Sequence, residues 1–504
     1  MNHYITKALS CYPKSDNQKK TSPLFKITFS LLFLFMGTLI HGQDYVNVGL
    51  HSSVDRVQPM TGIVFWADNS SDLNTLDNKV QLEYSYLVYS DVVEQEDVYD
   101  WTIVDNLLTT AAARGRQVIL RFRYTYPGVT SPSVPQYIRD RSDYTDQYES
   151  VEGSNTYIPD WSNQELENFT LEFFTKFAER YDNDARLAFL QVGFGSYSEY
   201  HLYNGPLVFG QTFPTKTYQT TFLQHVDSVF EETQWGISID AASSEYTPIA
   251  SSSTLLNLGY GLFDDSFLHE SHSTSDNEYN RGNWLTFGSD RADNYAAGGE
   301  LNYYSDWDQE HVLDVGGPYG FTFEEMSEMY DITYMIGNDQ LNYQTTTRIE
   351  DAGMATGYHY EVTEFKTNGT STQVTITNTG IAPIYYDAYP AVNGVASTTS
   401  LKGLIAGQSR TFTINAGASD ESLTIECDRL VSGQEIQFDA DIESGGIIPE
   451  TLTVAAVSNF SANGGTQTSA ITSNVNWTVS ENSNWVSITP TSGSDNGTIS
   501  ITAA

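Results

Sequence analysis

The residues best suited to chemistry follow an apolar run near the middle of the chain. This run, Leu187–Gly193, is typical of a buried strand, and it breaks into a turn of small residues, 194–201, that carries a carboxylate, an imidazole and two tyrosines. In a β/α barrel the functional side chains lie on the loops that follow the C-terminal ends of the strands. Glu199 in this turn is therefore the first catalytic candidate.

Further polar and aromatic residues follow other strand-like runs. Among them, Glu300 is the best-spaced partner for Glu199. Two carboxylates that face each other across the open end of a barrel can flank a glycosidic bond, one protonated as general acid and the other ionised as nucleophile or base. The remaining candidates are expected to bind substrate or to tune the two carboxylates, and they are Trp66, Asp68, Arg121, Arg123, Tyr124, Tyr197, His201, Asp240, Glu270, His272, Trp284, Tyr303 and Asn338.

The aromatic and arginine residues of this set suit carbohydrate binding, but they have structural alternatives. Indoles and phenols can stack on sugar faces. Arg121 and Arg123, which strand alternation places on one side, can hold a sulfate or carboxylate through bidentate hydrogen bonds. The same pair is equally suited to neutralising neighbouring carboxylates of the barrel. Likewise, Glu300 follows two glycines and can simply belong to a turn.

A metal site needs separate consideration because His269, His272 and Asp276 lie close together in the sequence. Their spacing matches no strong zinc pattern, and acidic chains supply such clusters by chance. No dinucleotide or phosphate loop and no serine-nucleophile elbow is present. We therefore expect no metal and no cofactor, and a metal-dependent hydrolase remains the alternative.

The elements that must position these residues alternate between apolar strand-like runs and amphipathic stretches, which indicates a parallel sheet covered by helices. Eight strands suggest a closed (β/α)8 TIM-like barrel over residues 45–350. The expected strands are 62–66, 81–89, 117–123, 187–193, 235–240, 266–270, 299–303 and 332–336.

After about residue 355 the periodicity changes to strict alternation, which predicts an antiparallel β-sandwich over 356–445. Gly445-Gly446 marks a linker. A further, partial Ig-like β module is expected over 451–504. The chain is thus predicted to be multidomain, α/β followed by all-β.

Composition limits the cellular setting and the partners. Basic residues followed by an apolar run from Ile27 to Ile40 are typical of a signal peptide, predicted over 1–42, with a retained membrane anchor as the alternative. The formal net charge of -40 argues against nucleic-acid partners and anionic membranes. Removal of the leader leaves Cys427 without an intrachain disulfide partner. We expect a secreted or cell-surface protein without stable membrane insertion, and its oligomeric state stays open.

Several segments together resemble a family of largely uncharacterised bacterial proteins with a glycoside-hydrolase-like barrel and an appended β-sandwich. The matching segments are 98–102, 113–121, 157–161, 179–182, 193–201, 298–300 and 334–338. The family's Gly-Glu-Trp-His turn is altered here to Ser198-Glu199-Tyr200-His201. The resemblance implies a retaining hydrolase whose acid/base follows strand four and whose nucleophile follows strand seven, roles that fall on Glu199 and Glu300.

The C-terminal segment resembles part of the BACON-type module, a carbohydrate-binding-associated module of Bacteroidetes polysaccharide enzymes. The resemblance rests on 460–465, 476–479, 484–488 and 490–493. Trp477 and Trp485 are expected in the core of this module rather than on a sugar-binding surface.

These observations together favour a glycoside hydrolase that cuts a polysaccharide at internal glycosidic bonds. The acidic surface and the local arginines suit a marine organism and a sulfated galactan of the carrageenan or agar type. A sulfated fucan is the next substrate to consider. The alternative from another class is a non-catalytic carbohydrate-binding or surface protein built on an inactive barrel.

Overall fold

The computed structural model describes residues 45–272, 278–337, 339–419, 422–445, 452–473, 475–481 and 483–504. The predicted signal segment therefore lies outside the described residues. The described part of the chain divides into two compact units, a larger one over Asn47–Ser444 and a smaller one that contains the described residues after Ser444. Within the described ranges, no helix is both long and apolar enough to cross a membrane.

Eight parallel strands close into a barrel in the larger unit, as the sequence predicted. In chain order they are β3 (Gly62–Trp66), β4 (Leu82–Val88), β7 (Gln117–Arg123), β10 (Leu187–Gln191), β11 (Gln234–Ser238), β12 (Tyr260–Phe267), β13 (Ala297–Leu301) and β14 (Tyr334–Ile336). Each strand pairs in parallel with the next, and β14 returns to β3. Glu199 and Glu300 thus follow or end strands four and seven of a TIM-type barrel.

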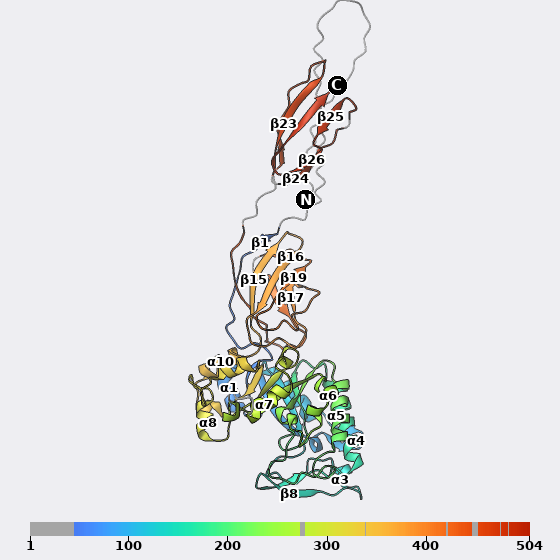
Figure 1. Cartoon of the computed structure of the whole chain (residues 1–504), viewed down its shortest axis with the longest axis vertical. Coiled ribbons are helices and arrows are strands. Elements are labelled where there is room, and N and C mark those ends of the chain that lie inside the picture. Colours follow the sequence, from blue (N-terminus) through green and yellow to red (C-terminus); the bar gives the residue numbers. More distant parts are fainter. Residues whose placement is uncertain are drawn as a thin grey trace, which may run out of the picture. The chain divides into compact units, whose positions relative to one another are not determined.

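Helices cover the outside of the barrel (Figure 1). They are α1 (Ser70–Leu76), α2 (Thr102–Ala113), α4 (Gln164–Tyr181), α5 (Lys216–Val229), α6 (Ser253–Leu256), α7 (Tyr279–Thr286), α8 (Asp306–His311), α9 (Phe323–Met329) and α10 (Thr346–Met354). Helix α4 shows why they form. Asn163 caps it by accepting from the Leu166 N–H, and its apolar positions, including Phe173 and Phe177, are fully buried against the sheet.

Additional short elements extend the loops at the C-terminal ends of the strands. They are the hairpins β5 (Val93–Gln95) with β6 (Val98–Tyr99) and β8 (Gln147–Val151) with β9 (Ser154–Ile158), and helix α3 (Gln136–Arg139). The β8–β9 hairpin follows β7 and reaches the turn after β10, where Glu152 accepts a hydrogen bond from the Tyr197 hydroxyl at 3.0 Å.

The sixth strand corrects one prediction. The sequence placed it at 266–270, whereas β12 spans Tyr260–Phe267 and a 3-10 turn covers Glu270–His272. Asp264 and Asp265 interrupt the apolar run, so the strand was not visible from hydrophobicity alone. Both carboxylates have buried partners: Asp265 pairs with Arg121, 144 residues away, and Asp264 pairs with His272, which lies in the turn after the same strand.

A β-sandwich follows the barrel within the same compact unit. One sheet has the order β19 (Ser409–Ile414), β16 (Thr372–Asn378), β15 (Tyr360–Thr367), β21 (Asp439–Ile442) and β2 (Leu50–Ser52), and β1 (Val46–Asn47) pairs with β15. The other sheet consists of β18 (Val395–Ala396), β17 (Tyr389–Val392) and β20 (Leu423–Glu426).

Two details of this domain differ from the prediction. Residues 46–52, expected in the barrel domain, form the strands β1 and β2 of the sandwich, because their partners β15 and β21 come from the far end of the unit. The sandwich is also not wholly antiparallel, since β15 and β21 run parallel.

The sandwich closes the N-terminal end of the barrel, which we call the barrel floor. Arg429 of the sandwich donates to the carbonyl of Leu187 at 2.7 Å, and its own carbonyl accepts from Gln117 at 2.7 Å. The Tyr386 hydroxyl accepts from the Gln234 N–H at 3.1 Å. All three barrel residues begin strands. Buried barrel residues and sandwich residues accordingly form one continuous hydrophobic cluster, which leaves the opposite end of the barrel as the open one.

The C-terminal unit has two antiparallel sheets of its own. One contains β22 (Leu452–Val454), β23 (Gly465–Ser473), β27 (Gly497–Ala503) and β25 (Val486–Thr489), and the other contains β24 (Asn476–Thr478) and β26 (Ser492–Ser494). Trp477 is buried between them and Trp485 packs against the same cluster. The core role predicted for Trp477 is therefore confirmed, whereas Trp485 is only partly buried at the edge of this core.

Candidate active site

The backbone of the turn after β10 is tightly constrained. A Cβ at Gly193 would lie 1.9 Å from the Ser198 carbonyl oxygen, and one at Gly195 would lie 2.0 Å from the His201 carbonyl oxygen, so only glycine fits at both positions. Tyr197 and Ser198 have φ angles of 57° and 60°, which is strained for residues with a side chain. The turn folds tightly upon itself and presents the next residue, Glu199, to the barrel opening.

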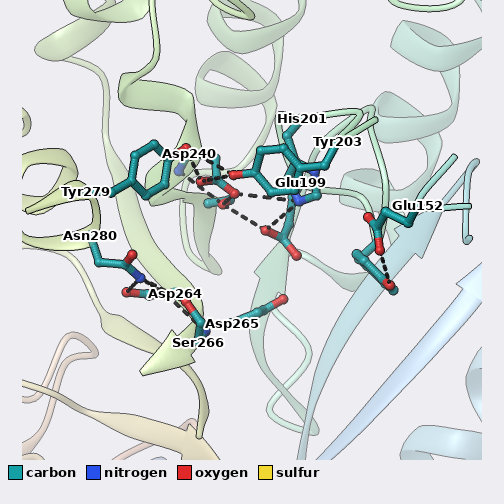
Figure 2. A network of polar contacts seen from close by, with 12 residues as sticks. Glu152, Glu199, His201, Tyr203, Asp240, Asp264, Asp265, Ser266, Tyr279 and Asn280 are labelled. Carbon is teal, nitrogen blue, oxygen red and sulfur yellow. Dashed lines mark hydrogen bonds and ion pairs between the residues drawn. The ribbon is translucent and has the colours of Figure 1, made fainter. Parts of the chain in front are cut away.

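Glu199 is buried at the centre of a polar network (Figure 2). Its Oε2 lies 3.3 Å from His201 Nε2 and 3.3 Å from Ser238 Oγ. Ser238 ends β11 and also lies 3.2 Å from Asp240 Oδ2, so one hydroxyl is shared between the two carboxylates. Two neighbouring strands of the barrel therefore contribute to holding the Glu199 side chain in one position.

Burial and the negative charges of Asp265 and Asp240 raise the pKa of Glu199 well above its ordinary value, against the opposing charge of Arg121. A carboxyl group whose pKa is raised holds its proton to a higher pH than a free glutamate does, which is the direction that a general acid requires. The surroundings of Glu199 therefore shift its pKa in the sense that its predicted role needs.

His201 contacts Glu199, and its surroundings favour the neutral form of its imidazole. Its ring is stacked on Tyr203 with centroids 3.8 Å apart, and its Nε2 lies 3.7 Å from Asp240 Oδ2. Burial lowers the pKa of His201 even though Asp240 favours the charged form. A neutral imidazole fits a role in orienting Glu199.

Asp240 is held by phenols that the sequence did not single out. Tyr279 and Tyr203 donate to its Oδ1 at 2.8 Å and 3.1 Å (Figure 2). Tyr203 lies in the loop after β10, and Tyr279 begins α7. Their role depends on the meeting of two loops 76 residues apart, so no local pattern marks it.

Glu300 lies in β13 and is only partly buried, unlike Glu199. Gly299 before it has a φ of 149°, and a Cβ there would lie 1.9 Å from the Asp264 carbonyl oxygen, so β12 and β13 approach closely. Besides burial, the charges of both Glu300 and Glu199 raise the pKa of Tyr303. Burial and the charges of several groups, again including these two glutamates, raise the pKa of Tyr86. Two phenols therefore experience the fields of both predicted carboxylates.

Arg121 lies in the interior of the barrel and is fully buried, which corrects its predicted role as a substrate ligand. It forms an ion pair with Asp265 at 2.7 Å, donates to Gln191 at 2.7 Å and to the Tyr197 carbonyl at 3.0 Å, and its guanidinium lies 4.1 Å from the Phe263 ring centroid. The alternative interpretation, that it neutralises a barrel carboxylate, is confirmed. Asp265 itself was missed because the misplaced sixth strand hid it.

Asp264, the neighbour of Asp265, organises a second buried cluster. His272 Nε2 lies 2.5 Å from Asp264 Oδ2, and the Trp284 indole donates to the same oxygen at 3.2 Å. Asn280 also donates to it, at 3.1 Å. Because both rings are almost fully buried on Asp264, the predictions that His272 and Trp284 contact substrate are corrected to structural roles.

The other aromatic candidates differ in whether they face the outside of the barrel or its open end. Tyr124 faces out of the barrel, where its hydroxyl lies 2.7 Å from Thr170 Oγ1 on α4, so its predicted stacking on sugars is wrong. Trp66 is half-buried at the end of β3, with its ring 5.7 Å from Tyr86. Tyr197 packs edge-on against Tyr126 at 4.9 Å near the open end.

Three further candidates lie at or after the C-terminal ends of the strands, and a fourth is not among the described residues. The guanidinium of Arg123 is half-buried, 4.8 Å from the Tyr126 ring centroid. Asp68 is exposed in the loop after β3, and Glu270 is exposed in the turn after β12. Asn338 lies outside the described residues.

Glu199, His201 and Asp240 form a candidate metal site that the sequence did not suggest. Donor atoms of Glu199, His201 and Asp240 all lie within 4.8 Å of one another, a carboxylate and imidazole set that suits zinc or similar ions. The histidines proposed from sequence do not converge, since His269 bonds to Ser271 while His272 bonds to Asp264. Asp276 lies outside the described residues.

Comparison with known proteins gives low similarities. No protein-family model matches the chain, and no curated protein matches it significantly in sequence. Among solved structures, endo-glycoceramidase II from Rhodococcus sp. shares 11% identity over 75% of this chain and 99% of its own, with a TM-score of 0.37. Xylanase 10B from Thermotoga maritima shares 9% identity over 61% and 94%, with a TM-score of 0.34.

A further similar structure is a GH5_18 protein from Bifidobacterium longum, with 8% identity over 58% of this chain and 77% of its own and a TM-score of 0.37. These neighbours are glycoside hydrolases. Because the TM-scores are below 0.4, the activity of this chain has to be inferred from its own site.

Proposed function

We propose that the protein is a glycoside hydrolase that uses two carboxylates and retains anomeric configuration. Glu199 protonates the departing glycosidic oxygen, and Glu300 attacks the anomeric carbon to form a covalent glycosyl intermediate. In the second step Glu199 removes a proton from water, which attacks the anomeric carbon and releases Glu300. The observation that carries this proposal is that Glu199 is buried among Ser238, His201 and Asp240, in surroundings that raise its pKa, in a barrel whose seventh strand carries Glu300.

The supporting groups have definite parts in this scheme. Ser238 and His201 orient the Glu199 carboxyl, and Asp240 with Asp265 favours its protonated form. Glu300 is less buried than Glu199, which fits the ionised state that a nucleophile needs. Arg121 balances the charge of Asp265 and so limits the number of uncompensated negative charges in the barrel.

For the substrate, we propose a polysaccharide cut within the chain, by a protein exported through its N-terminal segment. A marine galactan of the carrageenan or agar type is the first substrate to test, and a sulfated fucan is the second. With Arg121 engaged by Asp265, the binding of a sulfate group in this opening rests on Arg123. The choice between sulfated and unsulfated glycans therefore depends on contacts beyond the two carboxylates.

The test is product release from a panel of algal and plant polysaccharides by the wild type, Glu199→Gln and Glu300→Gln. We expect each substitution to reduce hydrolysis by about 10²-fold to 10⁴-fold or more. Glu231→Gln, which removes an exposed carboxylate from the loop before β11, serves as the control and should leave the rate unchanged. Azide should rescue Glu300→Ala as a glycosyl azide, because the small anion replaces the missing nucleophile.

Two outcomes would replace this proposal. A wild type that binds a glycan but never shortens it would indicate a carbohydrate-binding protein on an inactive barrel. Hydrolysis that a chelator abolishes and zinc restores would indicate a metal-dependent hydrolase, which the cluster of Glu199, His201 and Asp240 favours as the second candidate.

A further inference from the structure

An exposed group of aromatic side chains follows β13, directly beyond Glu300. Tyr304, Trp307 and Tyr319, which we call the aromatic platform, are 61%, 46% and 40% exposed. Tyr304 precedes α8, Trp307 lies in this helix, and Tyr319 follows it (Figure 1). Large aromatic side chains gathered on a surface commonly mark a binding site, because exposing them to water is unfavourable.

Two side chains of the platform have fixed neighbours, Tyr319 through a hydrogen bond and Trp307 through ring stacking. The Tyr319 hydroxyl donates to Asp308 Oδ1 at 2.7 Å, and Ser305 Oγ donates to Asp308 Oδ2 at 2.6 Å. The Trp307 ring lies 5.6 Å from the Tyr319 ring and is stacked at 4.5 Å on His311. A fixed arrangement binds a ligand with little loss of side-chain freedom.

The platform is continuous with the candidate active site. The Tyr304 ring contacts the ring of Tyr303 at 5.5 Å, and Tyr303 is the phenol that experiences the charges of Glu300 and Glu199. On the other side, the His269 ring lies 5.2 Å from Tyr304 and 6.4 Å from Tyr319. A chain of ring contacts thus leads from the two carboxylates to the outer surface.

The charge of this region selects against anionic ligands. Residues 292–347 contain 11 Asp and Glu residues and neither Lys nor Arg. Asp306 and Glu310 lie exposed on α8 beside Trp307. A sulfated or uronic glycan laid across the platform would meet these carboxylates, and Arg348, which reaches this region by donating to the Leu313 carbonyl, is already paired with Glu324. The apolar face of an uncharged sugar ring would not be repelled.

We propose that Tyr304, Trp307 and Tyr319 form a subsite for uncharged sugar residues of a glycan chain whose scissile bond lies between Glu199 and Glu300. This inference rests on the proposed hydrolase function and narrows its substrate. Of the galactans considered above, the subsite favours an agar-type chain that carries no sulfate over a sulfated carrageenan.

Binding measured without hydrolysis tests the subsite separately from the chemistry. The Glu199→Gln protein and its Trp307→Ala derivative are titrated with long agarose oligosaccharides, other neutral glycans such as galactomannan and mixed-linkage glucan, and κ-carrageenan oligosaccharides. We expect Trp307→Ala to weaken binding of a neutral glycan by about tenfold or more. Trp307→Phe should recover most of that loss, and Tyr389→Ala, a partly exposed aromatic of the sandwich, is the control that should bind as before.

The outcomes distinguish the two proposals. Unchanged binding after Trp307→Ala, a preference for κ-carrageenan that depends on Trp307, or no binding of any neutral glycan would each overturn the subsite. If Trp307→Ala weakens binding while Glu199→Gln and Glu300→Gln still hydrolyse at the wild-type rate, the subsite stands and the catalytic assignment fails. If hydrolysis requires both glutamates but binding does not change in Trp307→Ala, the catalytic assignment stands and the subsite fails.

Discussion

Replacing Asp240 by Asn should shift the pH profile of hydrolysis toward acid. The charge of Asp240 is one of the causes of the raised pKa of Glu199, and its removal makes the ionised form of Glu199 less unfavourable. The general acid then loses its proton at a lower pH. The basic limb of kcat/KM, which reports loss of the acid in the free enzyme, should move down the pH scale.

The size of this shift follows from the separation of the two carboxylates. Their ligand-competent oxygens lie within 4.8 Å. Two unit charges at that distance repel by about 0.9 kcal/mol in water and about 3.5 kcal/mol at an effective dielectric constant of 20. Since one pKa unit corresponds to about 1.4 kcal/mol, the pKa of Glu199 should fall by about 0.6 to 2.5 units.

The assay is the pH dependence of kcat/KM on whichever polysaccharide the wild type cuts. Glu245→Gln is the matched control, because it removes one negative charge from the same loop after β11 but at an exposed position. Solvent screening should leave its basic limb within about 0.2 units of the wild type. A basic limb that stays in place in Asp240→Asn, or moves toward alkali, would refute the assignment of Glu199 as a buried acid tuned by Asp240.

Two further predictions concern stability. Arg121→Met leaves Asp265 buried without its cation and should lower the free energy of unfolding by about 3 to 5 kcal/mol, measured by urea denaturation. Adding Asp265→Leu should recover much of this loss. An unchanged urea midpoint in the single variant would contradict the ion pair. Burial alone would raise the pKa of Asp264, but His272 and the hydrogen bonds from His272 and Asn280 lower it below 3.8. Asp264 therefore stabilises the fold above about pH 4, and this contribution is lost as the pH falls further, so unfolding free energies should drop more steeply below pH 4 in the wild type than in Asp264→Asn. Equal slopes would show that the carboxylate titrates alike in the folded and unfolded chains.

Local sequence signals were sufficient for much of the barrel and for the position of Glu199. Its strand is uninterrupted by charge, and the glycines around the turn mark a backbone that must pass close to itself. Strand alternation could also have shown that Tyr124 faces outward, since it follows the inward-facing Arg121 and Arg123 by odd steps.

The rest of the site depends on contacts that no local pattern encodes. Arg121 and Asp265 are 144 residues apart, so nothing near either one indicates that the arginine is already neutralised. Tyr203 and Tyr279 look like ordinary loop tyrosines until the barrel closes and both reach Asp240. The sixth strand was misplaced because its two aspartates interrupt the apolar run, and the partners that accommodate them, Arg121 for Asp265 and His272 for Asp264, are visible only in the folded chain.

The junction at the barrel floor also determines how this protein can be divided. Arg429 and Tyr386 bond to the strand beginnings, and the hydrophobic cluster runs without interruption from the barrel into the sandwich. A gene fragment ending after α10 would encode a barrel with an open apolar end and two orphaned N-terminal strands. Barrel and sandwich should therefore melt in a single calorimetric transition and be inherited, recombined and expressed only together, whatever module is attached after Ser444.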